Sequence, residues 1–130
     1  MGAKEKATAL HEQGFNCAQS VLGALGSYTG LDEKTALAVS AGFGGGVRCG
    51  EICGAVSGAV MALGLCNPHS EADDAAARAK MAKLTMAMTR DFAEHFGCVR
   101  CFDLKRAGKS CPVLIEYAAE KAEELIQNNR

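Results

Sequence analysis

Residues 42–66 read GFGGGVRCGEICGAVSGAVMALGLC, and the predicted fold is built around this segment. Five of its first nine residues are glycine, and an apolar segment of mostly small side chains follows, with Cys53 at the junction. Glycine and alanine recur along one side of the segment and larger aliphatic residues along another, so it is apolar all round. A helix of this kind is covered by its neighbours. We therefore expect a central helix over residues 51–65, which Asn67-Pro68 ends.

Apolar residues at helical spacing continue on both sides of this segment, and no stretch alternates with the period of two that marks a strand. Asn16 and Asp32 are good N-caps, and Pro112 suits the first turn of a last helix. The sequence predicts an all-α fold, a compact bundle of about five to six helices around the central Gly/Ala-rich one. The expected helices cover residues 3–14, 17–28, 33–41, 51–65, 70–96 and 111–127, with one further helical turn at 101–107.

The length, net charge and composition of the chain exclude several classes of protein. A length of 130 residues favours one domain, residues 1–130. The net charge is −1, aromatic residues make up 5% and tryptophan is absent, so nucleic acid would find neither a basic surface nor stacking platforms. The N-terminus is charged and lacks the apolar core of a secretory signal. The longest uncharged apolar run, 52–66, has 15 residues and is too short to cross a membrane. We expect a cytoplasmic protein without membrane insertion.

Seven cysteines are a high and odd number for a chain of this length. A disulfide framework does not suit a reducing compartment. Metal or cluster ligation, redox chemistry and passive burial remain as explanations.

The predicted helices place several cysteines at the same kind of position. Cys17 follows the cap Asn16, Cys53 opens the central helix and Cys111 starts the last helix, while Cys101 lies likewise in its short turn. Helix N-termini present free N–H groups and a positive potential, which lower the pKa of a thiol. We expect these four sulfurs to meet in one thiolate cluster, with or without a metal. The alternative is that each is a small buried apolar residue.

The glycine-rich loop, residues 42–50, matches neither common phosphate-binding pattern, since the third glycine of G-x-G-x-x-G is missing and Gly50 is not followed by Lys-Ser/Thr. Gly44, Gly45 and Gly46 could instead direct backbone N–H groups to a cofactor at the cysteines. The alternative is that these glycines allow two backbones to approach or supply positive φ in a tight turn. Arg48 and Glu51 flank the loop, where they could orient a ligand or each other, or form an ordinary surface ion pair.

Four stretches together resemble a known family. They are Gly14-Phe-Asn-Cys17-Ala-Gln-Ser-Val, Gly42-Phe-Gly-Gly-Gly46, Gly50-Glu-Ile-Cys53-Gly-Ala-Val-Ser-Gly58, and Phe96-Gly-x-x-x-Cys101 with Cys111. Over about residues 14–127 the chain is similar to the C_GCAxxG_C_C family of bacterial and archaeal proteins, which are described as redox-active. The family's four defining cysteines fall on Cys17, Cys53, Cys101 and Cys111. The resemblance implies an all-helical fold shared with the dimeric split-Soret cytochrome c group, and a bound prosthetic group such as an Fe–S cluster.

Three functional interpretations follow. In the first, Cys17, Cys53, Cys101 and Cys111 ligate an Fe–S cluster or another thiophilic metal for electron transfer to a redox partner protein. In the second, two of these cysteines cycle between dithiol and disulfide without a metal. In the third, the chain is a structural helical interaction protein with a zinc staple or no ligand. We also expect a homodimer, in which the small-residue face around Gly54 and Gly58 packs against a symmetry mate.

Overall fold

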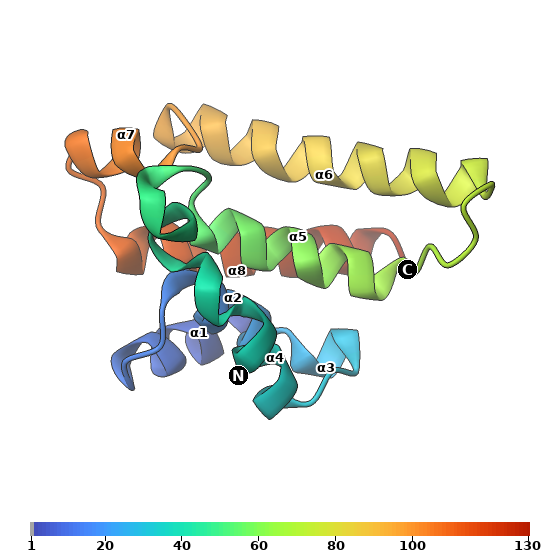
Figure 1. The fold of residues 1–130 in the computed structure, drawn as a ribbon, viewed down its shortest axis with the longest axis horizontal. Coiled ribbons are helices and arrows are strands. Elements are labelled where there is room, and N and C mark those ends of the chain that lie inside the picture. Colours follow the sequence, from blue (N-terminus) through green and yellow to red (C-terminus); the bar gives the residue numbers. More distant parts are fainter. Residues whose placement is uncertain (1) are drawn as a thin grey trace.

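The computed structural model describes residues 2–130, and this range is all-α, as predicted (Figure 1). Within it no strand forms, apart from an isolated antiparallel bridge between Ile52 and Arg100. Eight α-helices form in these residues, more than the five to six that were predicted. They are α1 (Ala3–Glu12), α2 (Cys17–Ala24), α3 (Gly26–Thr29), α4 (Glu33–Ser40), α5 (Gly54–Cys66), α6 (Ala75–Phe96), α7 (Cys101–Arg106) and α8 (Cys111–Asn128).

Two differences explain the higher helix count. The single helix predicted over residues 17–28 is divided at Leu25, where the backbone leaves helical geometry with φ −100° and ψ 13°. The turn predicted at 101–107 is a helix of its own, α7.

The ends of the helices follow local side-chain chemistry. The Asn16 side chain accepts a hydrogen bond from the Gln19 N–H at 2.9 Å and caps α2, and Asp32 caps α4 in the same way. The start predicted for the long helix, residue 70, is wrong. The Asp74 carboxylate accepts the Ala77 N–H at 3.0 Å, and α6 begins at Ala75.

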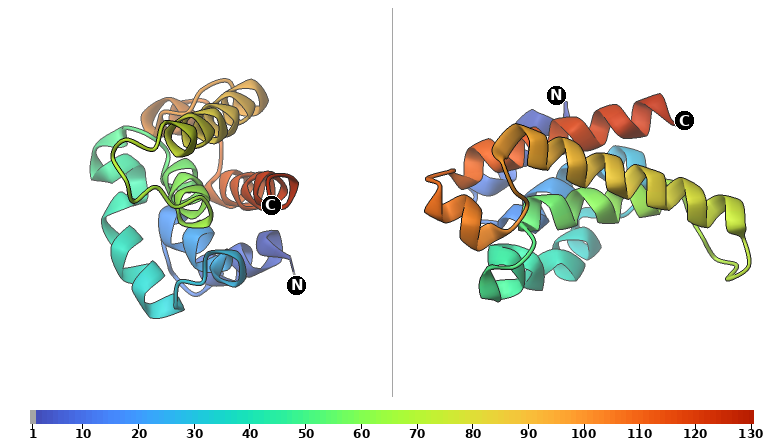
Figure 2. Two further views of the ribbon diagram at one scale, coloured as in Figure 1. Left: turned by 90° about the vertical axis from the view of Figure 1, so that its right-hand side faces the viewer. Right: turned by 90° about the horizontal axis from the view of Figure 1, so that it is seen from above.

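Helix α5 is the central helix, as predicted. It packs against α2, α6 and α8, and Figure 2 shows it enclosed between α6, α8 and the N-terminal helices. It begins at Gly54 instead of residue 51 because the residues before it pair with a distant segment. The Cys53 N–H donates to the Val99 carbonyl at 2.8 Å, and the Cys101 N–H donates to the Glu51 carbonyl at 2.6 Å.

The small-residue face of α5 packs against α2 of the same chain. A Cβ atom at Gly58 would lie 2.7 Å from the Ala18 carbonyl oxygen, and one at Gly54 would lie 2.8 Å from that of Phe43. This face is therefore used inside the molecule, and the prediction that a symmetry mate covers it is wrong. A homodimer stays a prediction without this face as its basis.

Helix α6 runs along one side of the molecule and packs on α5 and α8 (Figure 1). Its buried residues, Leu84, Met88, Phe92 and Phe96, lie four positions apart and form one apolar face. Among residues 2–130, no helix combines the length and apolarity needed to span a bilayer.

Candidate functional site

Four cysteines occupy the starts of four helices. Cys17, Cys101 and Cys111 are the first residues of α2, α7 and α8, and Cys53 is the N-cap of α5. Each sulfur is therefore attached next to backbone N–H groups that lack a partner within the helix, at the positive end of the helix dipole. The sequence predicted this placement for all four residues.

The fold brings these helix starts together. Helix α7, the loop before α5 and the start of α8 share one end of the molecule, at the left in Figure 1. The Cys17 and Cys111 thiols interact as a hydrogen-bonded pair, and this interaction raises the pKa of Cys17 and lowers that of Cys111. Burial raises the pKa of Cys53, backbone N–H groups at the start of α5 oppose this, and the neighbouring Cys101 and Cys111 sulfurs add a smaller increase. The four sulfurs thus influence one another, although they are far apart in the sequence.

Lys105 is a further member of this cluster, and it is not among the residues predicted from the sequence. Its Nζ atom lies 2.7 Å from the Cys111 sulfur. The pKa of Cys111 is lowered to about 5, mainly by the interaction with the Cys17 thiol and also by the Lys105 ammonium. The sequence contains one indication of this contact. Lys105 lies four residues after Cys101, in the last turn of a short helix that ends a few residues before Cys111.

The Cys17 and Cys111 thiols differ in charge and in access to solvent. The hydrogen bond that Cys17 donates to Cys111 raises the pKa of Cys17, and burial raises it further. Near neutral pH, Cys111 is therefore a thiolate and Cys17 a thiol. Cys17 is 8% exposed and Cys53 is 2% exposed, whereas Cys101 and Cys111 are partly exposed. An external reagent meets Cys111 before it can reach Cys17.

The loop before α5 has an unusual backbone. Gly45, Gly46, Val47 and Arg48 all have positive φ, between 57° and 64°, and form one left-handed turn. A Cβ atom at Gly46 would lie 2.4 Å from the Glu51 carbonyl oxygen, and one at Gly44 would lie 2.6 Å from the Asn16 side chain. The loop therefore fits the alternative interpretation of these glycines, in which they allow close approach of neighbouring atoms and supply positive φ in a tight turn. A cofactor-binding role for Gly44, Gly45 and Gly46 stays a prediction.

The charged residues beside the loop do not pair with each other. The Glu51 carboxylate accepts the Arg100 Nε–H at 3.4 Å in a surface ion pair. The Arg48 side chain is exposed. Of the alternatives weighed for Glu51, the ordinary surface ion pair is the one observed, with Arg100 instead of Arg48 as its partner.

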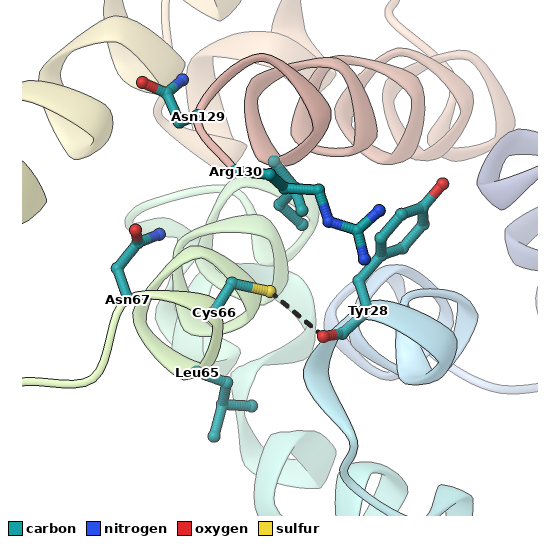
Figure 3. Close-up of a pocket in the computed structure, with 7 residues that line it drawn as sticks. Tyr28, Leu65, Cys66, Asn67, Asn129 and Arg130 are labelled. Atoms are coloured by element: carbon teal, nitrogen blue, oxygen red, sulfur yellow. Dashed lines mark hydrogen bonds between the residues drawn. The ribbon is translucent and has the colours of Figure 1, made fainter.

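Cys49, Cys66 and Cys98 lie outside the four-cysteine set. The exposed Cys49 thiol donates to the Gly46 carbonyl at 3.5 Å, within its own loop. Cys66 ends α5, about 20 Å along the 13-residue helix from Cys53. There its thiol donates to the Tyr28 carbonyl at 3.5 Å, in a small pocket beside Arg130 (Figure 3). Cys66 is therefore separate from the cluster.

The cluster has the donor chemistry of a thiophilic metal site, because thiolates are preferred by zinc, by copper(I) and by Fe–S clusters. As the side chains are arranged, no three His, Cys, Asp or Glu side chains within residues 2–130 form a group that could hold a metal ion. The Cys111 sulfur contacts a thiol and an ammonium instead. A metal bound by Cys17, Cys53, Cys101 and Cys111 stays a prediction.

Comparison with known proteins gives one finding. The sequence model of a family described as "Putative redox-active protein (C_GCAxxG_C_C)" matches residues 15–125. No curated protein and no solved structure matches the chain. The matched range contains all four helix-start cysteines and Lys105.

Proposed function

Because the chain belongs to the C_GCAxxG_C_C family, which is described as redox-active, we propose that it works by thiol–disulfide exchange at Cys17 and Cys111. The observation that supports this most is the arrangement around one sulfur. The Lys105 ammonium donates to the Cys111 sulfur at 2.7 Å, and the interaction with the Cys17 thiol lowers the pKa of the same sulfur. A partly exposed thiolate beside a second thiol is the arrangement that exchange requires.

The first step uses the charge difference between the two sulfurs. The Cys111 thiolate attacks one sulfur of an external disulfide, forms a mixed disulfide and releases the other sulfur as a thiolate. The Lys105 ammonium stabilises Cys111 before the attack, since it lies 2.7 Å from the sulfur. Low pKa favours the thiolate at neutral pH, although it also reduces the intrinsic nucleophilicity of that thiolate.

The second step involves Cys17. Its pKa is raised mainly by the hydrogen bond to Cys111. Once Cys111 is part of a neutral mixed disulfide, the anion that holds the Cys17 proton is gone, and the pKa of Cys17 falls. Cys17 then loses its proton to solvent and attacks the Cys111 sulfur, which forms the Cys17–Cys111 disulfide and releases the second external thiolate. The external disulfide gains two electrons and this protein loses two.

Thiol trapping with mass spectrometry tests this function. The protein is equilibrated between roughly −180 and −320 mV, the range of cellular thiol buffers, and its free thiols are alkylated. We expect one two-electron transition in which the peptides with Cys17 and Cys111 become linked. Cys66→Ser, at the opposite end of α5, should leave the transition unchanged, whereas Cys17→Ser should abolish it. If no cysteine pair changes state in this range, thiol exchange is not the function.

A second candidate is supported by the meeting of four helix starts at one end of the molecule. Cys17, Cys53, Cys101 and Cys111 would hold an Fe–S cluster or another thiophilic metal, with the backbone of Gly44, Gly45 and Gly46 and the side chains of Arg48 and Glu51 nearby. Such a cluster would supply one-electron transfer to a redox partner protein. The residues themselves would provide four thiolates at the positive ends of helices.

Anaerobic reconstitution separates the two candidates. The protein is incubated with iron and sulfide, desalted, and assayed for visible absorbance, metal and acid-labile sulfide. Cys101→Ser should lose the absorbance if a cluster is bound, and Cys66→Ser should keep it. A colourless, metal-free protein would contradict the cluster. Bound zinc in a protein whose cysteines show no redox change would favour a structural zinc site.

A further inference from the structure

An apolar and basic surface lies at the same end of the molecule as the cysteine cluster (Figure 1). It consists of the left-handed turn with Ile52, and of helix α7 with the linker that follows it. Val47, Ile52 and Phe102 are 50%, 43% and 50% exposed. Large apolar side chains that gather on one exposed surface are typical of an interaction site, whereas single ones are ordinary.

Several contacts show that these side chains belong to one continuous surface. A Cβ atom at Gly50 would lie 3.1 Å from the Cβ atom of Phe102, so the turn and α7 are in contact. Ile52 lies opposite Arg100 in the isolated bridge. The guanidinium groups of Arg100 and Arg106 lie 5.4 Å and 5.7 Å from the centre of the Phe102 ring. These two cations lie over the aromatic ring, and Phe102 is still half exposed.

The charge of this surface is opposite to that of the rest of the molecule. Residues 42–53 and 97–111 contain five basic and two acidic residues, a net charge of +3, whereas the whole chain has −1 and the remaining residues therefore have −4. Arg100 forms ion pairs with both acidic residues, Glu51 and Asp103. Within residues 2–130, Arg48 and Arg106 form no ion pair, so their charges face solvent.

The backbone of the turn gives an independent indication. Val47 has φ 57° and ψ 38°, a left-handed conformation that is strained for a β-branched residue. Its side chain is half exposed, so burial does not offset this strain. Strain that the fold maintains without a packing benefit is typical of functional segments. Here it holds Val47 and Arg48 outward beside the cysteine cluster.

We propose that this surface is the docking site of an acidic dithiol protein that reduces the Cys17–Cys111 disulfide. Apolar side chains at the centre with a basic rim match the anatomy of a protein interface, and the charges favour a partner rich in carboxylates. Lys105 lies in α7 and contacts Cys111, so a partner bound to α7 has its reactive group close to the disulfide. This inference depends on the proposed thiol exchange.

The redox step balances between the two proteins. A thiolate of the partner attacks the Cys111 sulfur, the Cys17–Cys111 bond breaks, and the Cys17 sulfur leaves and takes up a proton. The second thiolate of the partner attacks its own sulfur in the mixed disulfide and releases Cys111 as the thiolate beside Lys105. The partner is oxidised to a disulfide by two electrons, and this protein is reduced to the dithiol.

Reduction kinetics test the docking site, with a reduced thioredoxin of net negative charge as the probe. Its rate of reducing the oxidised protein is compared with the rates of dithiothreitol, which is small and neutral, and of glutathione, which is small and anionic. We expect the double variant Arg48→Glu/Arg106→Glu to slow thioredoxin at least about tenfold and to weaken the salt dependence of its rate. Dithiothreitol should react equally fast with both proteins. Lys83→Glu, on the exposed side of α6, is the matched control and should change none of the rates.

Each result decides the question. An unchanged thioredoxin rate in the double variant and in Phe102→Ala would overturn the docking site while leaving thiol exchange intact. An equal loss with glutathione would assign the charges to a small anionic ligand and also overturn it. An equal loss with dithiothreitol would show that the substitutions alter the disulfide itself, and it would also overturn the docking site. If the wild-type protein forms no disulfide at any potential, the proposed function fails and the docking site fails with it.

Discussion

The charge on Cys111 depends on two contacts that come from different helices. The interaction with Cys17, in α2, lowers its pKa, and Lys105, in α7, places an ammonium 2.7 Å from its sulfur. Its position at the start of α8 adds the positive end of a helix dipole. Two side chains and a helix end thus keep one thiol ionised where a free cysteine would be mostly protonated.

Replacing Lys105 with methionine tests the ammonium contact. This change removes the cation but keeps an aliphatic stem, so we expect the pKa of Cys111 to rise from about 5 toward its ordinary value of 9.0. A rise of one unit would lower the thiolate fraction at pH 5 from about half to about a tenth. The measurement is the pH dependence of iodoacetamide alkylation, detected by mass spectrometry on the peptide that contains Cys111.

Lys109→Met is the matched control for this substitution. It removes a cation from the linker after α7 and leaves the contact between Lys105 and Cys111 in place. We expect its alkylation profile to match that of the wild-type protein. If Lys105→Met also has the wild-type profile, the thiolate does not depend on the ammonium.

The sequence predicts the positions of the cysteines better than their contacts. An N-cap such as Asn16 is recognisable from a few neighbouring residues, and it places Cys17 at a helix start without knowledge of the fold. To predict the contact between Lys105 and Cys111, one must know how α7 and α8 are oriented relative to each other. The residues that connect the two helices do not show this orientation. Glu51 is a similar case, since its partner Arg100 is 49 positions away.

At the scale of elements, the contact between α5 and α2 depends on the absence of side chains. Gly58 lies against the backbone of Ala18, and a Cβ atom there would be 2.7 Å from a carbonyl oxygen. Since backbone atoms cannot move as freely as a side-chain end, Gly58→Ala must separate the two helices. We expect it to destabilise the protein by about 1–3 kcal/mol, measured by urea unfolding.

Gly64→Ala in the same helix provides the comparison. A Cβ atom at Gly64 would lie 3.7 Å from the terminal methyl group of Met81, an ordinary van der Waals distance. Alanine favours helix over glycine by roughly 1 kcal/mol, so this variant should be neutral or more stable than the wild type. If both variants lose the same stability, close approach to α2 is not the reason for glycine at position 58.

Element boundaries were predictable where a local cap sets them and not where a distant segment does. Asp32 caps α4 as predicted, because the cap and its partner are three residues apart. Helix α5 begins three residues later than predicted, at Gly54, since residues 51–53 instead hydrogen bond with residues 99–101. No pattern within the helix contains that information. The small-residue face of α5 was predictable because its pattern lies within one helix. The helix that packs against this face, α2, was not predictable from that pattern.

At the scale of the whole molecule, the two thiols couple folding to pH in opposite directions. The pKa of Cys111 is lower in the folded protein than in the unfolded chain, so between about pH 5 and pH 9 only the unfolded chain binds this proton and stability rises with pH. The pKa of Cys17 is raised by folding, mainly through its hydrogen bond to Cys111. Above about pH 9 the unfolded chain loses the Cys17 proton while the folded protein retains it, so stability falls.

We therefore expect the cysteine pair to stabilise the fold most near pH 9. Urea midpoints of the reduced protein at pH 6, 8 and 10 measure this, and the difference between the wild type and Cys111→Ser isolates the pair from other titrating groups. This difference should grow from pH 6 to pH 8, because the folded protein holds a thiolate that the unfolded chain must protonate. Above pH 9 the wild-type midpoint should decrease, because the buried Cys17 stays protonated only while the protein is folded. A difference that is constant across this range would mean that the contacts of Lys105 and Cys17 with Cys111 do not favour the thiolate in solution, and the first step of the exchange would then lack its nucleophile.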